Sequence, residues 1–320
     1  MRERIILTGA SGTLGHSLAT QLATSPNATV LCLQREDSQH RGFPAGIEHQ
    51  HIDFHQKEAL REVVQQFRPD CIIHCAASGT QFPRLNWFEM VRFNVNVTLD
   101  LCESASLIDK CNFVYVSTGL AYRDQGRALT EDDPLDTLHP YGASKAAADL
   151  LVRAAAAEFG VPLTVVRPFS FTGPGDNGSR LFPSLLRAAF EQRPLDMSSG
   201  DQVRDHCSVQ DIAAGILAAA FFGGACPPAL SVYNLGSGDT IPLKRLIEQV
   251  ASELDLGVKV NFGARDYAPF EPRFMVADAS RARTTLGWRP QINLAYAVWQ
   301  LAQESFPTLK LRRPRERCFP

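Results

Sequence analysis

The stretch IILTGASGTLG, residues 5–15, decides the fold of this chain. Its apolar start predicts the end of a buried strand, and residues 14–24 predict a helix that begins among the glycines. Glycines at such a junction permit a tight turn, let backbone N–H groups approach a pyrophosphate and let the helix pack closely on the strand. A glycine trio alone is a weak signal, but between the first strand and the first helix it favours a dinucleotide-binding turn over an ordinary glycine-rich loop. The residues expected to contact the dinucleotide here are Gly9, Ser11, Gly12, Thr13, Leu14 and Gly15.

Outward from this turn, short β-branched runs alternate with amphipathic stretches, which is the pattern of βαβ units and a parallel sheet. Strands are expected at residues 4–8, 29–34, 48–52, 71–75, 113–117 and 163–167, and helices at residues 14–24, 57–67, 87–108 and 141–159. The fold class is therefore α/β, with a Rossmann doubly wound parallel sheet in residues 1–167.

Beyond residue 167 the sequence pattern changes: the predicted elements are shorter, and clusters of proline and glycine separate them. Residues 168–320 are predicted to form mainly a smaller C-terminal α/β lobe that binds substrate, with some segments returning to the first domain. Helices are expected there at residues 182–191, 209–222 and 242–254, and the basic tail at residues 309–320 is expected to be loosely ordered.

The composition narrows the class of protein. With 320 residues, 45% of them hydrophobic and 21% charged, the chain is long enough for a main domain with an appended lobe. A formal net charge of -2 gives no broad attraction to nucleic acid or anionic lipid, so an anionic ligand has to be held by local donors. No stretch has the character of a signal peptide or reaches the roughly 20 apolar residues of a membrane span. The eight cysteines are scattered among the expected elements, which is typical of a reduced, cytoplasmic protein.

A metal site is not expected. Cys71 and Cys75 lie in an apolar run that predicts a buried strand, and the histidines form no HExxH pattern. Four histidines are therefore interpreted as ordinary core or surface residues: His49, His51, His55 and His74.

Tyr141 and Lys145 are the first catalytic candidates. The segment HPYGASK, residues 139–145, begins an alanine-rich helix, so these two side chains, four residues apart, project from one face of it. A phenol with a pKa of about 10 is a poor acid–base catalyst at neutral pH, and a neighbouring ammonium is expected to lower that pKa. Tyr141 is then expected to exchange a proton with a substrate oxygen while a hydride moves between the substrate carbon and a nicotinamide.

Thr118 is the third catalytic candidate. It follows the strand expected at residues 113–117, at the carboxyl end where ligands bind in open α/β sheets. Its hydroxyl is expected to hydrogen-bond the same substrate oxygen as Tyr141.

The end of the second strand bears on the choice of coenzyme. About 20 residues after the glycine turn, an NAD enzyme usually carries an acid that binds the ribose 2′-hydroxyl. This chain has Gln34 there, followed by Arg35, so no carboxylate repels a 2′-phosphate and a guanidinium is present to pair with one. The pattern favours NADP(H) over NAD(H), while a solvated surface arginine is the alternative interpretation of Arg35.

Together these motifs resemble the extended short-chain dehydrogenase/reductase family of nucleotide-sugar enzymes. The order of the glycine turn, Asp53-Phe54, Asn94, Ser117-Thr118 and the YxxxK motif is similar to the order in that family. The resemblance continues through the second half, in the stretches RPFSFTGPGD (residues 167–176), GDQVRDHCSVQD (200–211), YNLGSG (233–238) and LGWRP (286–290).

The resemblance implies roles for further residues. By the family's pattern, Asp53 and Phe54 hold the adenine of the cofactor, and Asn94 supports the sheet beside the nicotinamide. The other cofactor contacts that it implies are Ala76, Ala77 and Phe169, in addition to Tyr141 and Lys145.

The same resemblance implies a site for a nucleotide-diphosphate sugar. Arg204 falls where the family places an arginine on the diphosphate, and this role is preferred to a simple ion pair with Asp205. The remaining implied substrate contacts are Ser78, Thr118, Ser170 and Arg273. Ser170 replaces an asparagine of the family's pattern, which leaves the contacts at that position open.

One departure from the family narrows the reaction. The family's 4,6-dehydratases carry an Asp-Glu pair directly after the threonine, whereas Gly119 and Leu120 follow Thr118 here, so dehydration is not expected. Two reactions remain: 4-ketoreduction of a nucleotide-activated keto-deoxysugar by NADPH, and 4-epimerisation with tightly bound NAD.

The segment at residues 261–290 is similar to synthases of dideoxyhexoses such as CDP-abequose and CDP-paratose, which are 4-ketoreductases. Together with Arg35, this similarity favours reduction. A third hypothesis is a regulator that senses a dinucleotide without turning it over. Such proteins usually lose the tyrosine and lysine, so the intact Tyr141 and Lys145 argue against it.

Two helices are expected to form a dimer interface. The helices at residues 87–108 and 141–159 carry apolar stripes beyond what one face of a sheet needs, and the resemblance implies that they pair across a dimer axis. The alternative is that both stripes simply pack on the sheet. A homodimer is the prediction.

Overall fold

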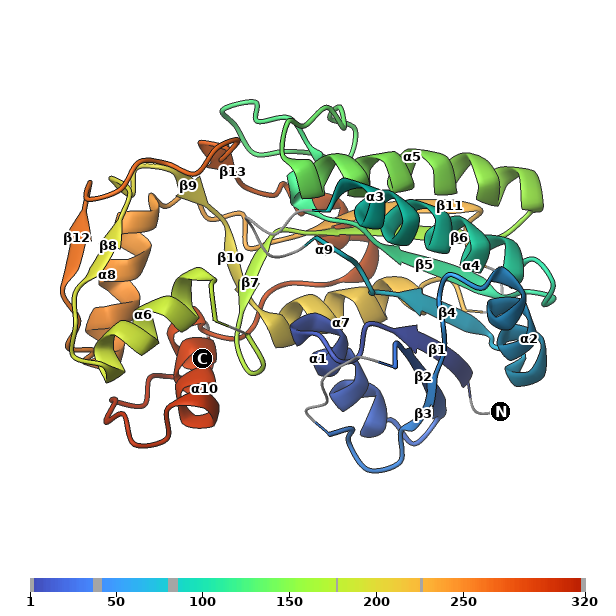
Figure 1. Ribbon diagram of the computed structural model, residues 1–320, viewed down its shortest axis with the longest axis horizontal. Helices are drawn as coiled ribbons and strands as arrows, with labels where there is room; N and C mark the ends of the chain where they lie inside the picture. Colours follow the sequence, from blue (N-terminus) through green and yellow to red (C-terminus); the bar gives the residue numbers. More distant parts are fainter. Residues whose placement is uncertain (1–2, 37–41, 80–85, 177, 225–226, 318–320) are drawn as a thin grey trace.

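A seven-stranded sheet organises the protein (Figure 1). The computed structural model describes residues 3–36, 42–79, 86–176, 178–224 and 227–317. The strands are β1 (Glu3–Thr8), β2 (Ala28–Gln34), β3 (Glu48–His51), β4 (Cys71–His74), β5 (Asn112–Val116), β6 (Leu163–Pro168) and β11 (Leu230–Leu235). Neighbouring strands pair in parallel, in the order β11-β6-β5-β4-β1-β2-β3.

The chain reverses its direction of travel across the sheet between β1 and β4. The carboxyl ends of these two strands are therefore the switch point, where open α/β sheets bind their ligands. We call residues 9–15, 75–79 and 117–121, which follow β1, β4 and β5, the switch-point loops.

Helices cover both faces of the sheet because the central strands are apolar on both sides. One face carries α2 (Lys57–Phe67), α3 (Trp87–Met90), the π-helix η1 (Val91–Val97), α4 (Thr98–Ala105) and α5 (Pro140–Phe159). The other face carries α1 (Thr13–Ala23), α7 (Val209–Ala220) and α9 (Ser280–Leu286). In Figure 1 the long helix α5 lies above the sheet, while α1 and α7 lie below it.

The smaller lobe is built from short elements around a separate core. Its helices are α6 (Leu181–Phe190), α8 (Leu243–Leu254) and α10 (Leu294–Ser305), whose buried leucines form one cluster. Its short strands pair in parallel: β7 (Ser170–Thr172) with β10 (His206–Ser208), β8 (Leu195–Met197) with β12 (Val260–Phe262), and β9 (Val203–Arg204) with β13 (Phe274–Met275).

The expected parallel α/β architecture is confirmed, and the expected strands and helices of the first half lie within three residues of the observed ones. The structure differs in the second half. The helix α7, which the sequence assigned to the lobe, packs on α1 because Ile212, Ala213 and Ile216 join the core beneath the sheet. The strand β11, which was not expected, pairs with β6 as the last strand of the sheet.

The C-terminal tail also differs from the expectation of loose order. As far as Arg317 it is held against the lobe: Arg312 donates from its backbone N–H to Leu254 O at 2.8 Å, and Arg317 bridges to Ile292. Leu309 and Leu311 pack on the lobe core. These apolar contacts hold the tail in place, whereas its basic composition had led to the expectation of loose order.

Several general features concern only the described residues. Within them no helix is long and apolar enough to cross a membrane, and no group of three or more His, Cys, Asp and Glu side chains gathers in a way that holds a metal. Cys71 and Cys75 are free thiols in and beside the buried strand β4. Cys226 and Cys318 lie outside the described residues.

Candidate active site

The glycine turn after β1 is packed too tightly for a side chain at Gly9 or Gly15. Gly9 has a φ of +80°, and a Cβ there would lie 2.6 Å from the backbone N of Ala76. A Cβ on Gly15 would lie 2.0 Å from the carbonyl oxygen of Gly9. The turn therefore brings the start of α1 and the loop after β4 together at the switch point, and glycine at these positions is a steric requirement.

The start of α1 is open for an anion. Gly12 is its N-cap and supplies no side-chain hydrogen bond, so the first backbone N–H groups of the helix are not capped by it. Leu14 is buried in the core, and the Thr13 hydroxyl donates to Gly175 O at 2.8 Å, which ties the turn to the loop after β7. What this turn offers a phosphate is therefore mainly backbone N–H groups, together with the partly exposed Ser11.

Asn94 connects the loop after β4 to the helix that carries the catalytic candidates. Its side chain accepts from Ser78 N at 2.7 Å, and its amide donates to Ser78 O at 2.9 Å and to Ser144 Oγ at 2.8 Å. Ser144 Oγ in turn donates to Tyr141 O at 2.8 Å. Since these bonds occupy both amide hydrogens, Asn94 acts on the site by holding Ser78 and α5 in place.

Tyr141 and Lys145 lie on the first turns of α5 as expected. The helix begins at Pro140 with His139 as its N-cap, and the phenol is half-buried while the Lys145 side chain is 1% exposed. Lys145 Nζ lies 4.2 Å from the centre of the Tyr115 ring and has no hydrogen-bond partner among the described residues. Burial lowers the pKa of Lys145 to about 7.

The prediction that Lys145 lowers the pKa of Tyr141 is wrong for the ligand-free protein. Its pKa is raised above the ordinary value because of burial, with a further contribution from Cys75, whereas a lowered pKa was predicted from the neighbouring ammonium. Burial also disfavours the charged form of Lys145, so desolvation is the main cause of both pKa shifts.

Behind these two residues, α5 is anchored to β6 by a buried ion pair. Asp149, one turn after Lys145, accepts two hydrogen bonds of 2.9 Å from the guanidinium of Arg167. Arg167 also donates to the Tyr122 hydroxyl at 2.7 Å. A charge pair buried to this extent fixes the axial position of the helix, and therefore of Tyr141.

Thr118 follows β5 by two residues, in a conformation that leaves its proton available. Its Oγ1 accepts from Leu120 N at 3.2 Å as the N-cap of the short 3₁₀ helix η2 (Gly119–Ala121), so its O–H is not used in that bond. A Cβ on Gly142 would lie 2.1 Å from Leu120 O, which shows how closely η2 approaches the first turn of α5. The short helix that Thr118 caps therefore lies against the turn of α5 that carries Tyr141.

The residue after Thr118 has no room for an acid. A Cβ on Gly119 would lie 2.9 Å from the ring of Phe169, which is itself buried against Tyr122. Phe169 was predicted as a cofactor contact, and its ring fills the space beneath Gly119. The absence of the dehydratase pair from the sequence is thus matched by the packing.

At the far end of β2 and β3 lie the residues expected near the adenosine. Gln34 is buried and its amide lies 3.2 Å from His51 Nε2, while Arg35 is exposed with its guanidinium 5.7 Å from the centre of the Phe93 ring. Asp53 is exposed and Phe54 is buried against Phe93. A hydrogen bond from His55 N, before other causes, lowers the pKa of Asp53, so it offers a charged acceptor.

In the lobe, Arg204 pairs with a residue that the sequence did not single out. Its guanidinium donates to Glu271 Oε1 at 3.2 Å and to Pro272 O, and not to the adjacent Asp205. Asp205 instead accepts from Ser237 N at 2.7 Å and from Ala277 N at 3.1 Å. Arg204 and Glu271 are far apart in sequence, so no local pattern predicted their contact.

The other expected substrate contacts lie on neighbouring elements. Ser170 begins β7 and pairs in register with His206 of β10, and Ser78 is held by Asn94 as described. Arg273 is exposed, and its guanidinium lies 3.2 Å from the centre of the Tyr267 ring, to which it is stacked. Ala77 is partly exposed in the loop after β4.

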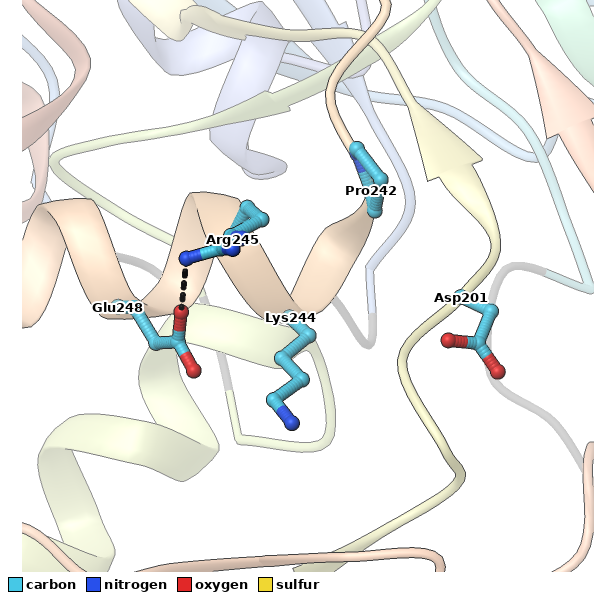
Figure 2. Close-up of a pocket in the computed structure, with 5 residues that line it drawn as sticks. All are labelled: Asp201, Pro242, Lys244, Arg245 and Glu248. Atoms are coloured by element: carbon cyan, nitrogen blue, oxygen red, sulfur yellow. Dashed lines mark ion pairs between the residues drawn. The ribbon is translucent and has the colours of Figure 1, made fainter.

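A surface pocket of about 310 Å³ lies elsewhere, at the start of α8 (Figure 2). Asp201, Pro242, Lys244, Arg245 and Glu248 line it, and Arg245 pairs with Glu248 across a helix turn. None of the predicted site residues lines this pocket. It is shallow and charged, and it is not the place where the polar groups of the switch-point loops meet.

Two observations fit a nicotinamide dinucleotide at the switch point. The glycine turn places uncapped N–H groups where a pyrophosphate needs donors. The buried ammonium of Lys145 has no hydrogen-bond partner within the described part of the chain, and ligand hydroxyls would provide one. Lys145 and the start of α1 are the groups that would hold the two halves of the dinucleotide.

A model of the NAD dependent epimerase/dehydratase family matches residues 5–236. The chain belongs to this family. It is thereby an enzyme of the short-chain dehydrogenase/reductase type with a nicotinamide dinucleotide cofactor.

Named relatives give the family membership more detail. This epimerase/dehydratase is 28% identical to a UDP-glucuronate 4-epimerase of Thermodesulfobacterium geofontis over 76% of this chain and 74% of that protein. It is 32% identical to a dTDP-glucose 4,6-dehydratase of Streptomyces griseus over 71% of this chain and 68% of that protein.

Among solved structures, a Bacillus cereus UDP-glucuronic acid 4-epimerase in complex with UDP-glucuronic acid and NAD has the same fold. Its TM-score is 0.81 at 23% identity, over 94% of this chain and 98% of that one. At this identity the likeness concerns the fold alone.

Proposed function

We propose that this protein is a nucleotide-sugar 4-epimerase that keeps a bound NAD and inverts the sugar hydroxyl at C4. The observation that carries the proposal is the buried side chain of Lys145, one turn after Tyr141, whose Nζ has no hydrogen-bond partner among the described residues. The names of the relatives and the ligands of the Bacillus cereus structure support NAD and a nucleotide-diphosphate sugar as the pair of ligands.

The residues of the chain supply proton transfer and orientation. A bound nicotinamide supplies the acceptor and donor for the hydride at C4. Tyr141 takes the proton of the C4 hydroxyl as the C4 carbonyl forms. After the keto-sugar has turned its opposite face toward the nicotinamide, the hydride returns to C4 and Tyr141 returns the proton to the C4 oxygen. Thr118 donates its free O–H to the same oxygen, and Lys145, when hydrogen-bonded to ligand hydroxyls, stabilises the anionic phenol.

Reduction of a 4-keto-deoxysugar by NADPH is the second candidate, and it was the one that the sequence favoured. It uses the same residues, and two features support it: β2 ends in Gln34, whose amide faces His51, and not in an acid, and Arg35 is exposed beside that strand end. The relatives named above are epimerases and a dehydratase, so they give the reductase no specific support.

A substrate panel separates the two reactions. Purified protein is mixed with UDP-glucose and UDP-glucuronate without added coenzyme, and separately with NADPH and CDP-, dTDP-, GDP- and UDP-linked 4-keto-6-deoxysugars. Interconversion of a UDP-sugar with its 4-epimer, without net consumption of coenzyme, is the expected result. Loss of nicotinamide absorbance with a keto-sugar, and no epimerisation, would overturn the proposal in favour of the reductase.

The coenzyme is tested separately at Arg35. If the exposed guanidinium pairs with a 2′-phosphate, Arg35→Ala weakens NADP much more than NAD, with the nearby exposed Arg92→Ala as a matched control. Dissociation constants of both coenzymes measured by calorimetry give the answer. Equal loss of both coenzymes would remove the argument from Arg35 for NADP and for reduction.

We also propose a homodimer through the helix pair α3–η1–α4 and α5. These helices contact each other and still expose large apolar side chains: Trp87, Phe88 and Val91 on one, and Leu150 and Leu151 on the other. Large exposed apolar side chains on helices that contact each other are typical of a protein–protein interaction site. Light scattering at micromolar concentration should give twice the mass of the chain, and Leu150→Glu should halve it. A monomeric wild-type mass would refute the interface.

A further inference from the structure

His74 is a fully buried side chain at the end of β4 that the proposed reaction does not use. Its ring lies between the end of β1 and the start of α4: Thr8 Oγ1 is 2.8 Å from Nδ1, and Thr98 Oγ1 is 3.1 Å from Nε2. Thr8 is directly followed by the glycine turn, and Thr98 directly follows the π-helix that contains Asn94. The ring thus connects the two segments that shape the dinucleotide site.

The partners of the two threonines fix the direction of each hydrogen bond. Thr98 Oγ1 donates its only proton to Asn94 O at 2.6 Å, so toward His74 it can only accept, and Nε2 must carry a hydrogen. A neutral ring then has a bare Nδ1, which accepts from Thr8 Oγ1. Thr8 Oγ1 in turn accepts from Ala76 N at 3.2 Å. One tautomer of His74 satisfies all four bonds.

The neutral ring is also the form that its surroundings favour. Burial, before the nearby Lys145, lowers the pKa of His74 to about 3. The His74 and Tyr115 ring centres are 6.2 Å apart, and Lys145 Nζ also lies close to the Tyr115 ring. A charged imidazole would therefore place a second cation in the same buried region.

Both ends of the chain of bonds reach residues that line the site. At one end, Ala76 N belongs to the loop after β4, directly beside Gly9. At the other end, Asn94 holds the amide and carbonyl of Ser78 in the same loop, and through Ser144 it reaches Tyr141 O. The loop is therefore held on both sides by one connected set of bonds with His74 at its centre.

We propose that His74, fixed as the Nε2–H tautomer, is a positioning residue that keeps the glycine turn, the loop after β4 and the start of α5 in register for the dinucleotide. It touches neither cofactor nor substrate and acts through Thr8, Thr98 and Asn94. The inference needs only a dinucleotide site and not the identity of the sugar. The positioning role of His74 can therefore be refuted while the epimerase proposal stands, and the epimerase proposal can be refuted while the positioning role stands.

The tautomer is tested spectroscopically. In long-range ¹H–¹⁵N spectra of the full-length protein without added substrate, His74 is expected to show a protonated Nε2 and a bare Nδ1 from pH 5 to pH 9. Assignment follows from the signals lost in His74→Gln. A protonated Nδ1, or an imidazolium signal within that range, would overturn the proposal, because either form breaks the deduced sequence of bonds.

The positioning role is tested with matched threonine variants. Thr98→Val keeps the shape of the side chain but removes the hydroxyl, and it should weaken NAD binding by about tenfold. Thr98→Ser keeps the hydroxyl and should restore binding to within about twofold. Thr164→Val, a buried threonine of β6 outside the chain of bonds, should leave the dissociation constant unchanged.

The same three variants distinguish a positioning role from a general loss of stability. Melting temperatures are recorded for each variant, and hydrogen exchange is followed in the peptides that contain Ala76, Ser78 and Ala143. In Thr98→Val, exchange should rise in these peptides and not in α8, which belongs to the lobe core. Equal NAD affinity in the Val and Ser variants, or a uniform rise of exchange over the chain, would refute the positioning role.

Discussion

The switch-point loops and the lobe differ in where their polar groups find partners. Around the loops, Asn94 and His74 complete bonds that fix the backbone, while Lys145 Nζ has no partner among the described residues and no side chain caps the start of α1. In the lobe, Arg204 is satisfied by the chain itself, because Glu271 and the carbonyl of Pro272 accept its hydrogen bonds.

This contrast concerns the cost of binding. A site whose donors are already fixed and unpartnered needs no rearrangement to accept a ligand, whereas a guanidinium held by a carboxylate has to exchange one acceptor for another. We infer that the dinucleotide side of the enzyme is preorganised and that the sugar-nucleotide side adjusts when its ligand arrives. Three variants test this difference.

Tyr141→Phe should have the largest effect. Removal of the phenolic oxygen eliminates the proposed proton carrier and leaves the helix and the Asn94 bonds in place, because these use backbone atoms of residue 141. Turnover of the accepted nucleotide sugar should fall by about 10²–10⁴-fold, while NAD affinity changes little. An enzyme that keeps wild-type turnover would rule out the assignment of Tyr141.

Lys145→Met should stabilise the ligand-free protein while it lowers turnover. The pKa of Lys145 is lowered from 10.5 to about 7, so the unfolded chain binds more protons than the folded protein between those values. Wild-type stability therefore rises as the pH rises through this window, and the burial penalty is fully present below pH 7. At about 1.36 kcal/mol per pKa unit, the penalty is on the order of a few kcal/mol.

The measurement for this variant is urea denaturation of both proteins at several pH values. The advantage of Lys145→Met should be greatest near pH 6 and shrink toward pH 10. Groups that titrate in both proteins cancel in the difference. A constant advantage, or none, would contradict a buried, destabilised ammonium.

Glu271→Gln should have the smallest effect and tests the lobe. Removing the negative charge weakens the internal ion pair of Arg204, whose side chain is 11% exposed, and leaves the guanidinium readier for a diphosphate. The dissociation constant of UDP, measured by calorimetry, should fall by up to about tenfold. Asp196→Asn, on the neighbouring β8, serves as the charge-matched control. Weaker UDP binding in Glu271→Gln would mean that Glu271 orients Arg204 and does not compete for it.

Much of the sheet half was predictable because its signals are local. The glycine turn, the strand periodicity and the YxxxK spacing each involve residues a few positions apart, and the structure places Tyr141, Lys145 and Thr118 around one site. The strand β11 was missed because its sequence, LSVYNL, is short and partly polar. It also follows a cluster of proline and glycine, and such clusters predicted the lobe.

Other features could not be predicted because they depend on contacts between distant segments. The role of His74 follows from two threonines that are 66 and 24 positions away, and a lone histidine in an apolar strand gives no hint of them. The direction of the pKa shift of Tyr141 depends on burial, which the spacing of two residues does not reveal. The partner of Arg204 lies 67 positions further along the chain.

The π-helix η1 has a consequence for how one helix serves two purposes. A π-helical turn holds about one residue more than an α-helical turn, so the residues before it are rotated by roughly 100° relative to those after it. This phase shift lets Trp87 and Phe88 face outward while Asn94 and Thr98 face the interior. Loss of a single residue from this segment would rotate the outward aromatic surface, on which the proposed dimer rests, relative to the inward amide of Asn94, so one feature of the backbone constrains both.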